Sequence, residues 1–191
     1  ELKALHQHPK FQKKISMDGL SLYFKHGYIR APYSIFEYTY KLEPGHILTI
    51  NQNQDIQQHC YWDIRDVVLN PNNNDSHEAR VEQLESLLKE SVGLRMVSDV
   101  PIGVFLSGGI DSSLVTALMQ AQSADPVQSF TIGFEEQAYN EAGYAKKIAA
   151  YLGTRHHEQI CTASDCLSVI PKLADIYDEP FADSSAVPTY L

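Results

Sequence analysis

The stretch "VFLSGGIDSSLV", residues 104–115, decides the fold class of this chain. An apolar run typical of a buried strand leads into Ser-Gly-Gly, and the Asp-Ser-Ser that follows can open a helix. A glycine-rich turn between a strand and a helix is typical of loops that hold phosphate groups. Two common loops of this kind are excluded. The ATPase loop requires a lysine, but no lysine lies between Lys89 and Lys146. The dinucleotide motif requires three spaced glycines, but Gly108 and Gly109 are adjacent and the third glycine is missing.

Strands and helices are expected to alternate around this loop. Apolar runs predict strands, and apolar residues at helical spacing predict helices. The expected strands cover residues 102–106, 127–134 and 155–161, and the expected helices cover residues 112–122, 141–152 and 164–177, with Gly153 ending the second helix and Pro171 marking a kink in the third. Apolar strands joined by helices imply parallel βαβ units. The sequence therefore predicts an α/β fold with a doubly wound parallel sheet that helices cover on both faces.

The first third of the chain has a different sequence pattern, and residues 1–65 are expected to form strands and turns. "GHILTI" (45–50) and "IQQHCYW" (56–62) flank the turn-forming residues "NQNQD", which predicts a β-hairpin. The Asn-rich "NPNNND" that begins at residue 70 is the best candidate for a linker. We therefore expect three parts: residues 1–65, a linker over 66–76, and a second domain over 77–191.

The second domain is expected to open with a helix. Its apolar residues recur at helical spacing, namely Val81, Leu84, Leu87, Leu88 and Val92. Asp75 precedes Glu78 by three positions, as in a capping box with Asp in place of Ser or Thr. This spacing predicts that Asp75 caps the helix.

Composition narrows the class of protein. The chain has 191 residues, of which 43% are hydrophobic and 20% charged, so it can bury a real core. A net charge of −9 argues against a general binder of nucleic acid or of anionic membranes. No apolar run reaches the roughly 18 residues of a membrane span. Three cysteines without a paired framework favour a reducing cytosol, and hence a cytoplasmic protein.

Two further expectations concern the ends of the chain and its cysteines. The chain begins at Glu1 without Met and stops at Leu191 directly after a motif, so we expect an internal fragment of a longer protein. A metal half-site formed by Cys161 and Cys166, with His156 and His157 nearby, is conceivable, but the spacing fits no familiar zinc pattern.

The loop after the first strand carries the chemistry. Gly108 and Gly109 let the backbone turn sharply and bring amide groups close to a ligand. Hydroxyl donors and the free N–H groups of the new helix add to this anion site, the donors being Ser107, Ser112 and Ser113. A carboxylate at Asp111 would repel phosphate unless a divalent cation bridges the two. Magnesium prefers this combination of carboxylate and phosphate oxygens as ligands. The structural alternative is that Asp111 and Ser112 merely cap the helix.

Several stretches, in matching order along the chain, carry a resemblance to a known family. "RMVSDVPIGVFLSGGIDSS" (95–113), "SFTIGFEEQAYNEAGYAKKIAAYLGTRHHE" (129–158) and "DEPFADSSAVPTYL" (178–191) resemble the synthetase domain of the asparagine synthetases. These enzymes belong to the ATP pyrophosphatases, which make acyl adenylates. "ELKAL", "GYIRAPYSIFEYTYKLEPGHIL" and "YW", all within residues 1–62, resemble the closing part of their glutamine-hydrolysing domain. The resemblance covers nearly the whole chain.

The resemblance implies a two-site enzyme with an adenine nucleotide alpha hydrolase-like synthetase domain. An N-terminal-nucleophile glutaminase of the class II amidotransferase type frees ammonia from glutamine, and the synthetase site activates aspartate with ATP and Mg²⁺ as β-aspartyl-AMP. By resemblance the pyrophosphate lies on one loop, formed by Ser107, Gly108, Gly109, Asp111, Ser112 and Ser113, with Asp111 as the magnesium ligand. Leu106 and Ile132 match positions whose backbone groups hold adenine, although both also suit a plain β-core.

The last motif is open to two interpretations. Asp178, Glu179 and Asp183 crowd three carboxylates into six positions, which is costly unless they meet cations or water. They and Ser184 either lie near the substrate or have a structural role, with Ser184 as a cap for the helix that follows. For His156 and His157 a structural role is favoured over catalysis.

Parts of the family pattern are missing. The cysteines of this chain are internal, so none matches the leading glutaminase nucleophile, and the Ser-Gly-acidic-Gly-x-Asp element does not occur. We therefore expect the 191 residues alone to be inactive.

Three rivals remain open: a paralogue that adenylates another carboxylate, such as a β-lactam-forming synthetase or a sugar-modifying amidotransferase, a glutamine-independent ligase, and a non-catalytic nucleotide-binding protein. Homodimers are common in the resembled enzymes, but these residues do not reveal an oligomeric state.

Overall fold

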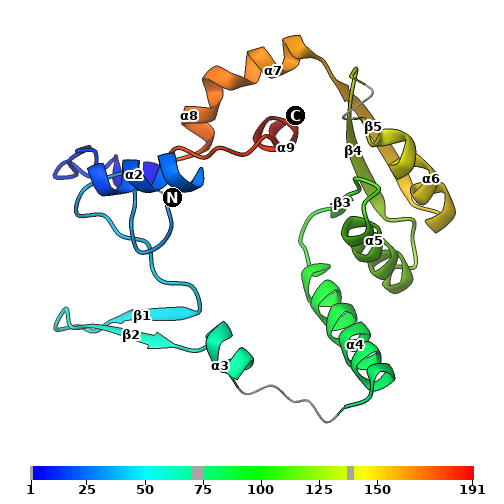
Figure 1. Ribbon diagram of the computed structural model, residues 1–191, viewed down its shortest axis with the longest axis horizontal. Coiled ribbons are helices and arrows are strands. Elements are labelled where there is room, and N and C mark those ends of the chain that lie inside the picture. Colours follow the sequence, from blue (N-terminus) through cyan, green and yellow to red (C-terminus); the bar gives the residue numbers. More distant parts are fainter. Residues whose placement is uncertain (1, 70–74, 137–139) are drawn as a thin grey trace. The chain divides into compact units, whose positions relative to one another are not determined.

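The computed structural model describes residues 2–69, 75–136 and 140–191 (Figure 1). Contacts divide the chain into two compact units, one formed by residues 1–73 and 168–190 and the other by residues 74–167 and 191. Each unit is described by itself. Most of the expected linker "NPNNND" lies outside the described residues, and the contacts group residues 168–190 with the first unit, whereas the expected second domain runs to residue 191. The domain boundaries stay a prediction.

The second unit is built on a three-stranded parallel sheet. Its strands are β3 (Gly103–Phe105), β4 (Gln128–Phe134) and β5 (Arg155–Cys161), in the order β3-β4-β5. Helices α5 (Ile110–Gln122) and α6 (Ala142–Leu152) connect them, as Figure 1 shows. The alternation of strands and helices expected from the sequence is confirmed. Helix α5 begins at Ile110, two residues before its expected start.

Two small cores hold this unit together. Val92 of α4 (His77–Arg95) packs with Leu118 and Met119 of α5, and with Val127. Leu106 packs with Ala145 and Ala149 of α6. The inward residues Ser129 and Thr131 of β4 are buried, whereas Phe130, between them, is 39% exposed. One face of the sheet is therefore covered by helices within this unit.

The ends of the helices follow local signals, with one correction. Helix α6 ends at Gly153, which has a left-handed φ of 74°, as expected from the sequence. The capping residue of α4 is Ser76, whose Oγ accepts a hydrogen bond from the N–H of Ala79 at 3.2 Å. The expectation that Asp75 caps this helix is therefore wrong. Serine competes well for this place because its short side chain reaches back to the first free N–H groups.

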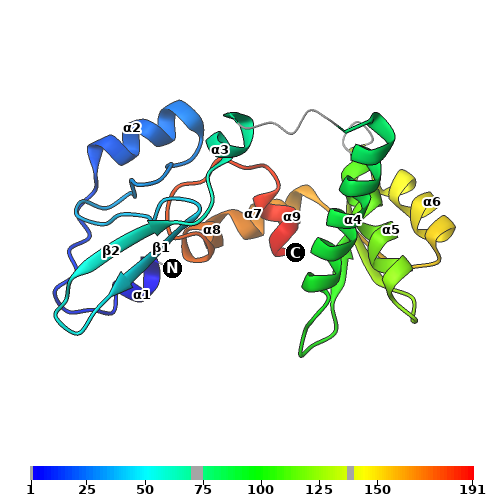
Figure 2. The same cartoon turned by 90° about the horizontal axis from the view of Figure 1, so that it is seen from below.

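The first unit combines short helices with a hairpin. Strands β1 (His46–Ile50) and β2 (Ile56–Cys60) pair antiparallel, so the expected hairpin is confirmed (Figure 2). Helices α1 (Leu2–Leu5) and α2 (Met17–His26) are corrections, because residues 1–65 were expected to hold only strands and turns. The core consists of Ile29, Ile35 and Phe36, with Leu20, Leu22 and Tyr23 of α2 packed against it.

The remaining elements of the structure are short. Helix α3 covers Ile64–Leu69, α7 covers Ala163–Val169, α8 covers Leu173–Ile176 and α9 covers Ala186–Tyr190. A 3-10 turn at Ile170–Lys172, which contains Pro171, separates α7 from α8, so the expected kink is confirmed. Within the described part of the chain, none of the helices combines the length and the apolar composition needed to cross a membrane.

Candidate functional site

The candidate loop, residues 106–113, follows the carboxyl end of β3 and includes the first four residues of α5. Its first residue is fixed to the neighbouring strand: the N–H of Leu106 donates to the carbonyl of Phe130 at 2.8 Å, and the hydroxyl of Thr131 donates to the carbonyl of Leu106. Leu106 itself is only 1% exposed. In parallel sheets ligands bind beyond the carboxyl ends of the strands. The loop therefore starts from a rigid position at the edge of the sheet where ligands bind.

Hydrogen bonds among serines shape the loop. The N–H of Ser107 donates to Ser112 Oγ at 3.2 Å, and the two hydroxyl oxygens lie 3.0 Å apart. Ser113 donates its hydroxyl to the carbonyl of Gly109 at 2.6 Å, and the N–H of Gly109 donates to Ser107 Oγ at 3.3 Å. These hydrogen bonds link four residues, Ser107, Gly109, Ser112 and Ser113, into a small serine ring in which the hydroxyl groups of Ser107 and Ser112 contact each other.

Gly108 is the residue on which the turn depends. Its φ is +85°, a left-handed conformation that favours glycine. A Cβ at this position would lie 2.9 Å from Cβ of Tyr144 and 3.0 Å from the backbone nitrogen of Ala145, both at the start of α6. Helix α6 therefore packs directly against the backbone of the loop, and no larger residue fits between them.

The first turn of α5 is open to a ligand. Its N-cap is Gly109, which offers no side-chain hydrogen bond to the helix. The alternative in which Asp111 and Ser112 cap this helix is therefore wrong, because both residues lie inside its first turn. The first N–H groups of a helix have no partner within the helix, and together they attract negative charge. This arrangement suits a phosphate group, and phosphate binding at the loop stays a prediction.

Asp111 places a carboxylate in that first turn, and its side chain is exposed. A carboxylate next to an anion-binding helix end can hold a divalent cation that a phosphate also contacts. The open N–H groups and the small hydroxyl-bearing residues therefore fit ATP phosphates, and the one accessible carboxylate fits Mg²⁺.

Of the two residues expected near adenine, Leu106 directly follows β3 and Ile132 lies in the adjacent strand β4. The N–H of Leu106 already donates to Phe130, and its carbonyl already accepts from Thr131. Ile132 is half-buried in β4. The structural reading of Leu106 as β-core therefore holds, while contact of either backbone with adenine stays a prediction.

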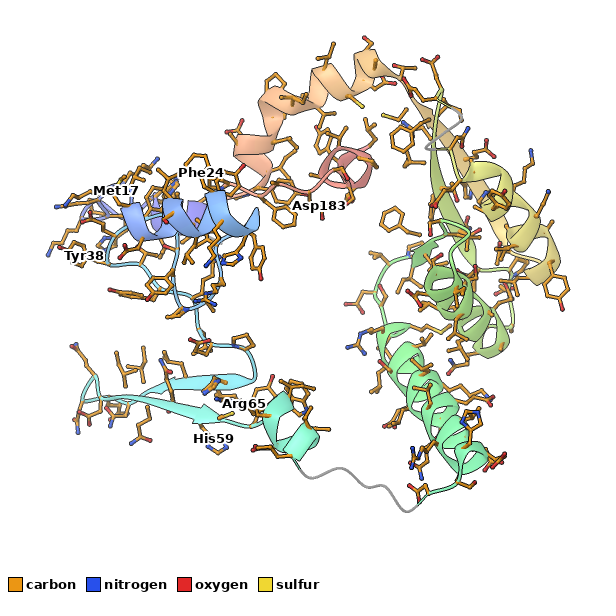
Figure 3. The ribbon with its side chains drawn as sticks, in the orientation of Figure 1. Met17, Phe24, Tyr38, His59, Arg65 and Asp183 are labelled. Atoms are coloured by element: carbon orange, nitrogen blue, oxygen red, sulfur yellow. The ribbon has the colours of Figure 1, made fainter. Side chains whose placement is uncertain are left out.

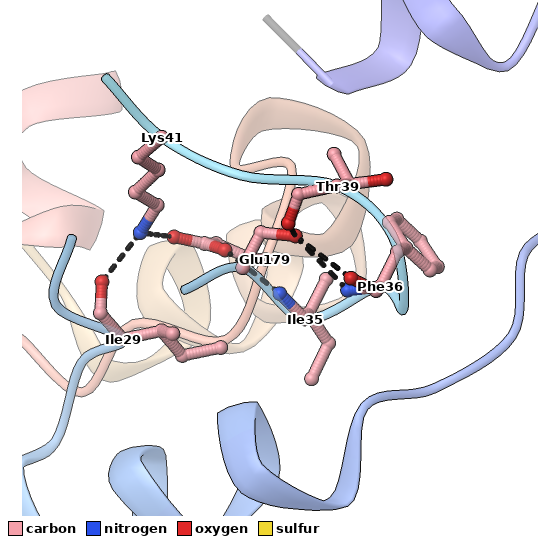
Figure 4. A network of polar contacts seen from close by, with 7 residues as sticks. Ile29, Ile35, Phe36, Thr39, Lys41 and Glu179 are labelled. Atoms are coloured by element: carbon pink, nitrogen blue, oxygen red, sulfur yellow. Dashed lines mark hydrogen bonds and ion pairs between the residues drawn. The ribbon is translucent and has the colours of Figure 1, made fainter. Parts of the chain in front are cut away.

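The carboxylates of "DEPFADSS" are already engaged within the first unit. Glu179 accepts a hydrogen bond from the N–H of Ile35 at 3.2 Å and forms an ion pair with Lys41, whose ammonium also donates to the carbonyl of Ile29 (Figure 4). Asp178 lies 3.4 Å from the ammonium nitrogen of Lys3. Two lysines therefore balance two of the three crowded carboxylates, which supports the structural reading of this motif.

Asp183 stabilises its own turn ahead of α9 (Figure 3). Its Oδ1 accepts hydrogen bonds from the N–H and the hydroxyl of Ser185 at 2.8 and 2.7 Å, and these bonds lower the pKa of the Asp183 carboxyl. The carboxylate of Asp183 thus closes the turn that precedes α9, and capping of this helix by Ser184 stays a prediction. A part in substrate binding for Asp178, Glu179, Asp183 or Ser184 stays a prediction.

The two histidines have structural roles, as expected. His156 Nδ1 lies 3.0 Å from Ser129 Oγ, and burial lowers the pKa of its imidazole. His157 stacks on Phe130 with ring centroids 5.0 Å apart. Within residues 2–69, 75–136 and 140–191, no group of three or more His, Cys, Asp or Glu side chains could hold a metal ion. The conceivable metal half-site of Cys161 and Cys166 is therefore not supported by a third ligand.

Sequence reasoning missed several residues that position this site. Thr131 and Tyr144 support the loop but carry no motif, and only the fold brings them next to it. Lys41 is the partner of Glu179 across 138 positions of sequence, a separation at which no local pattern gives a signal.

Comparison with known proteins agrees with this geometry. Residues 83–191 match the family model described as asparagine synthase, and residues 1–62 match that of a glutamine amidotransferase domain. The putative asparagine synthetase (glutamine-hydrolyzing) 2 of Methanocaldococcus jannaschii is 37% identical over 100% of this chain and 37% of its own length. Asparagine synthetase (glutamine-hydrolyzing) 1 of Bacillus subtilis is 31% identical over 93% of this chain and 27% of its own.

A fungal relative bears a different name. The amidase chry2 of Gibberella zeae is 33% identical over 65% of this chain and 21% of its own length. The chain thus spans about a third or less of the curated relatives it matches. Since the asparagine synthase model covers more than half of the chain, and includes the whole loop described above, the chain belongs to the asparagine synthase family.

Proposed function

We propose that the protein containing this chain is a ligase that converts aspartate into asparagine, with ammonia taken from glutamine. The side-chain carboxylate of aspartate attacks the α-phosphorus of ATP, the bond to the bridging oxygen of the β-phosphate breaks, and pyrophosphate leaves. Ammonia then attacks the acyl carbon of the resulting β-aspartyl-AMP, and AMP leaves with one carboxylate oxygen. Hydrolysis of glutamine to glutamate supplies the ammonia.

One observation supports this proposal most strongly: the uncapped first turn of α5 lies beside the serine ring of residues 107–113, in a family described as asparagine synthase. In this role the first N–H groups of α5 and the hydroxyls of Ser107, Ser112 and Ser113 bind the leaving pyrophosphate. Their orientation is fixed before ATP arrives, so little reorganisation opposes the reaction. Mg²⁺ held by Asp111 would neutralise the charge that develops on the phosphates.

The other parts of the proposal rest on the family. Residues 1–62 would belong to a glutaminase of the N-terminal-nucleophile type, because they match a glutamine amidotransferase domain. The synthetase sheet would be doubly wound, with further elements over the face on which Phe130 is exposed. A cytoplasmic location and a homodimer likewise stay predictions, and the proposed partners are the small molecules aspartate, glutamine and ATP.

Pyrophosphate release by the full-length protein tests the proposal. We expect release with ATP, Mg²⁺ and aspartate, supported by ammonia or glutamine. Asp111→Asn should abolish release, whereas Asp125→Asn, which changes an exposed aspartate in the turn after α5, should leave it unchanged. Turnover retained in Asp111→Asn would overturn the magnesium assignment.

The relatives named as amidases support a second candidate function. Because these proteins match 65% of the chain, a paralogue that adenylates another carboxylate is the runner-up. Release of pyrophosphate that requires an acid other than aspartate would favour this paralogue. ATP binding without release with any acid would favour a non-catalytic nucleotide-binding protein.

A further inference from the structure

Two cysteines outside the loop lie next to each other. Cys161 is the last residue of β5, and Cys166 lies in the first half of α7. Their sulfur atoms are 3.4 Å apart. Cys161 is 1% exposed, whereas Cys166 is half-buried and so can be reached from solvent. The third cysteine, Cys60, is exposed in the hairpin of the first unit.

A capping box holds the two thiols in this arrangement. Thr162 precedes α7, and its N–H and hydroxyl donate to Asp165 Oδ2 at 2.9 and 2.7 Å. In return the N–H of Asp165 donates to the Thr162 hydroxyl oxygen at 3.2 Å, and the N–H of Cys166 donates to the carbonyl of Thr162 at 3.1 Å. The turn between the cysteines is therefore closed by four hydrogen bonds, and both side chains stay on one side of it.

We propose that Cys161 and Cys166 form a redox-active dithiol that a low-molecular-weight disulfide, such as oxidised glutathione, converts into an intrachain disulfide. The thiolate of Cys166, the more accessible residue, attacks one sulfur of the small disulfide, and one small thiol leaves. The sulfur of Cys161 then attacks Cys166 in the mixed disulfide, and the second small thiol leaves. The protein loses two electrons and two protons, and the small disulfide is reduced to two thiols.

The geometry requires little movement for this bond. A disulfide joins its sulfurs at about 2.0 Å, so the two atoms must approach by about 1.4 Å. We expect rotation of the two side chains to bring the sulfurs together, because side chains can move between staggered rotamers. The bond would tie the start of α7 to the carboxyl end of β5, the same edge of the sheet at which the candidate loop lies after β3.

The resting state of the pair is the dithiol. Burial raises the pKa of the Cys161 thiol to about 11, and its hydrogen bond with Cys166 adds to this effect. A thiol of this kind is a poor nucleophile at neutral pH. Oxidation must therefore begin at Cys166. Once Cys166 is in the mixed disulfide, its thiol no longer raises the pKa of Cys161, and the short distance between the two sulfurs favours attack by Cys161 within the chain. Disulfides of this type in a reducing compartment are transient or sensing rather than structural.

Peptide mass spectrometry on the full-length protein tests the proposal. The protein is incubated in mixtures of oxidised and reduced glutathione, quenched in acid, alkylated and digested with trypsin. Residues 156–172 then form one peptide with both cysteines, and Cys60 lies on the separate peptide 42–65. We expect the first peptide to lose two hydrogen masses without retaining glutathione, whereas Cys60 gains one glutathione per thiol.

Two variants separate the steps. In Cys161→Ser, the glutathione adduct should persist on Cys166, because the resolving thiol is gone. In Cys166→Ser, Cys161 should stay a free thiol under conditions that modify Cys60. The proposal is overturned if both thiols of the wild-type peptide are alkylated while Cys60 carries glutathione. It is also overturned if Cys161→Ser, with an unchanged circular dichroism spectrum, retains no adduct.

Discussion

At the scale of single residues, Gly108 determines whether the candidate loop can form. The glycine pair is visible in the sequence, but its neighbours are not, because Tyr144 and Ala145 follow more than thirty positions later in the chain. The sequence therefore predicts the loop, its turn and the helix over residues 141–152, but not the packing of that helix against Gly108. This packing makes the position sensitive for two reasons, the left-handed φ and the short distance to α6.

Replacement of this glycine should be costly. Gly108→Ala puts a side chain into a left-handed conformation, at a cost of about 1–3 kcal/mol, and forces its Cβ against the backbone of α6. We expect a lower urea midpoint and loss of pyrophosphate release. Gly143→Ala is the matched control, since a Cβ there meets nothing within 4 Å and the residue lies within α6. This control should gain up to about 1 kcal/mol of stability. An unaffected Gly108→Ala protein would contradict the packing described above.

A second residue-scale prediction concerns Asp183, whose pKa the bonds from Ser185 hold below the ordinary value of an aspartate. Ser185→Ala removes the hydroxyl donor but keeps the N–H, so the pKa of Asp183 should rise part of the way back. Because the folded-state pKa is depressed, the stabilisation is present above the unfolded pKa and is lost as pH falls through the folded value. NMR titration of the Asp183 carboxyl carbon measures the shift, and an unchanged titration in Ser185→Ala would contradict the assignment of these bonds.

At the scale of elements, periodicity and caps predicted most of the second unit. The alternation of β3, α5, β4, α6 and β5 is confirmed because apolar runs and Gly153 mark these elements. Helix α2 was missed although the sequence carries its signals. Ser16 accepts a hydrogen bond from the N–H of Gly19, and Gly27 ends the helix with a φ of 78°. Residues that cap both ends therefore indicate a short helix better than the β-type runs nearby argue against one.

The corrected cap of α4 gives a test at this scale. Ser76→Ala should destabilise the protein by about 1 kcal/mol, because the N–H of Ala79 loses its acceptor. The expected change for Asp75→Ala is smaller, since Asp75 precedes the N-cap residue of the helix. Urea unfolding of both variants decides between the two residues. A larger loss in Asp75→Ala would restore Asp75 as the cap.

At the scale of the whole molecule, long-range pairs join segments that the sequence separates widely. In the first unit Glu179 binds both Ile35 and Lys41 (Figure 4), and the N–H of Ala182 donates to the carbonyl of Gly27 at 2.8 Å. Such contacts cannot be predicted from one sequence, because nothing local in "DEPFADSS" names a partner. They explain why three neighbouring carboxylates are tolerated.

Removal of this link should weaken the first unit. Glu179→Ala removes the carboxylate that pairs with the ammonium of Lys41 and leaves the N–H of Ile35 without its acceptor, and we expect a loss of about 1–3 kcal/mol in unfolding free energy. Glu43→Ala, in the same segment as Lys41, is the control and should change stability by less than about 0.5 kcal/mol. Equal effects of the two changes on chemical unfolding would contradict a specific role for the Glu179 pair.

The central claim is that the loop of residues 106–113 serves an enzyme that activates a carboxylate by adenylation. The most direct test is to supply the full-length protein with ATP, Mg²⁺, ammonia and aspartate labelled with ¹⁸O in its side-chain carboxylate. If β-aspartyl-AMP forms, attack on its acyl carbon leaves one labelled oxygen on AMP, and pyrophosphate accumulates in equal amount. Unlabelled AMP, or the formation of ADP and phosphate in its place, would contradict the account.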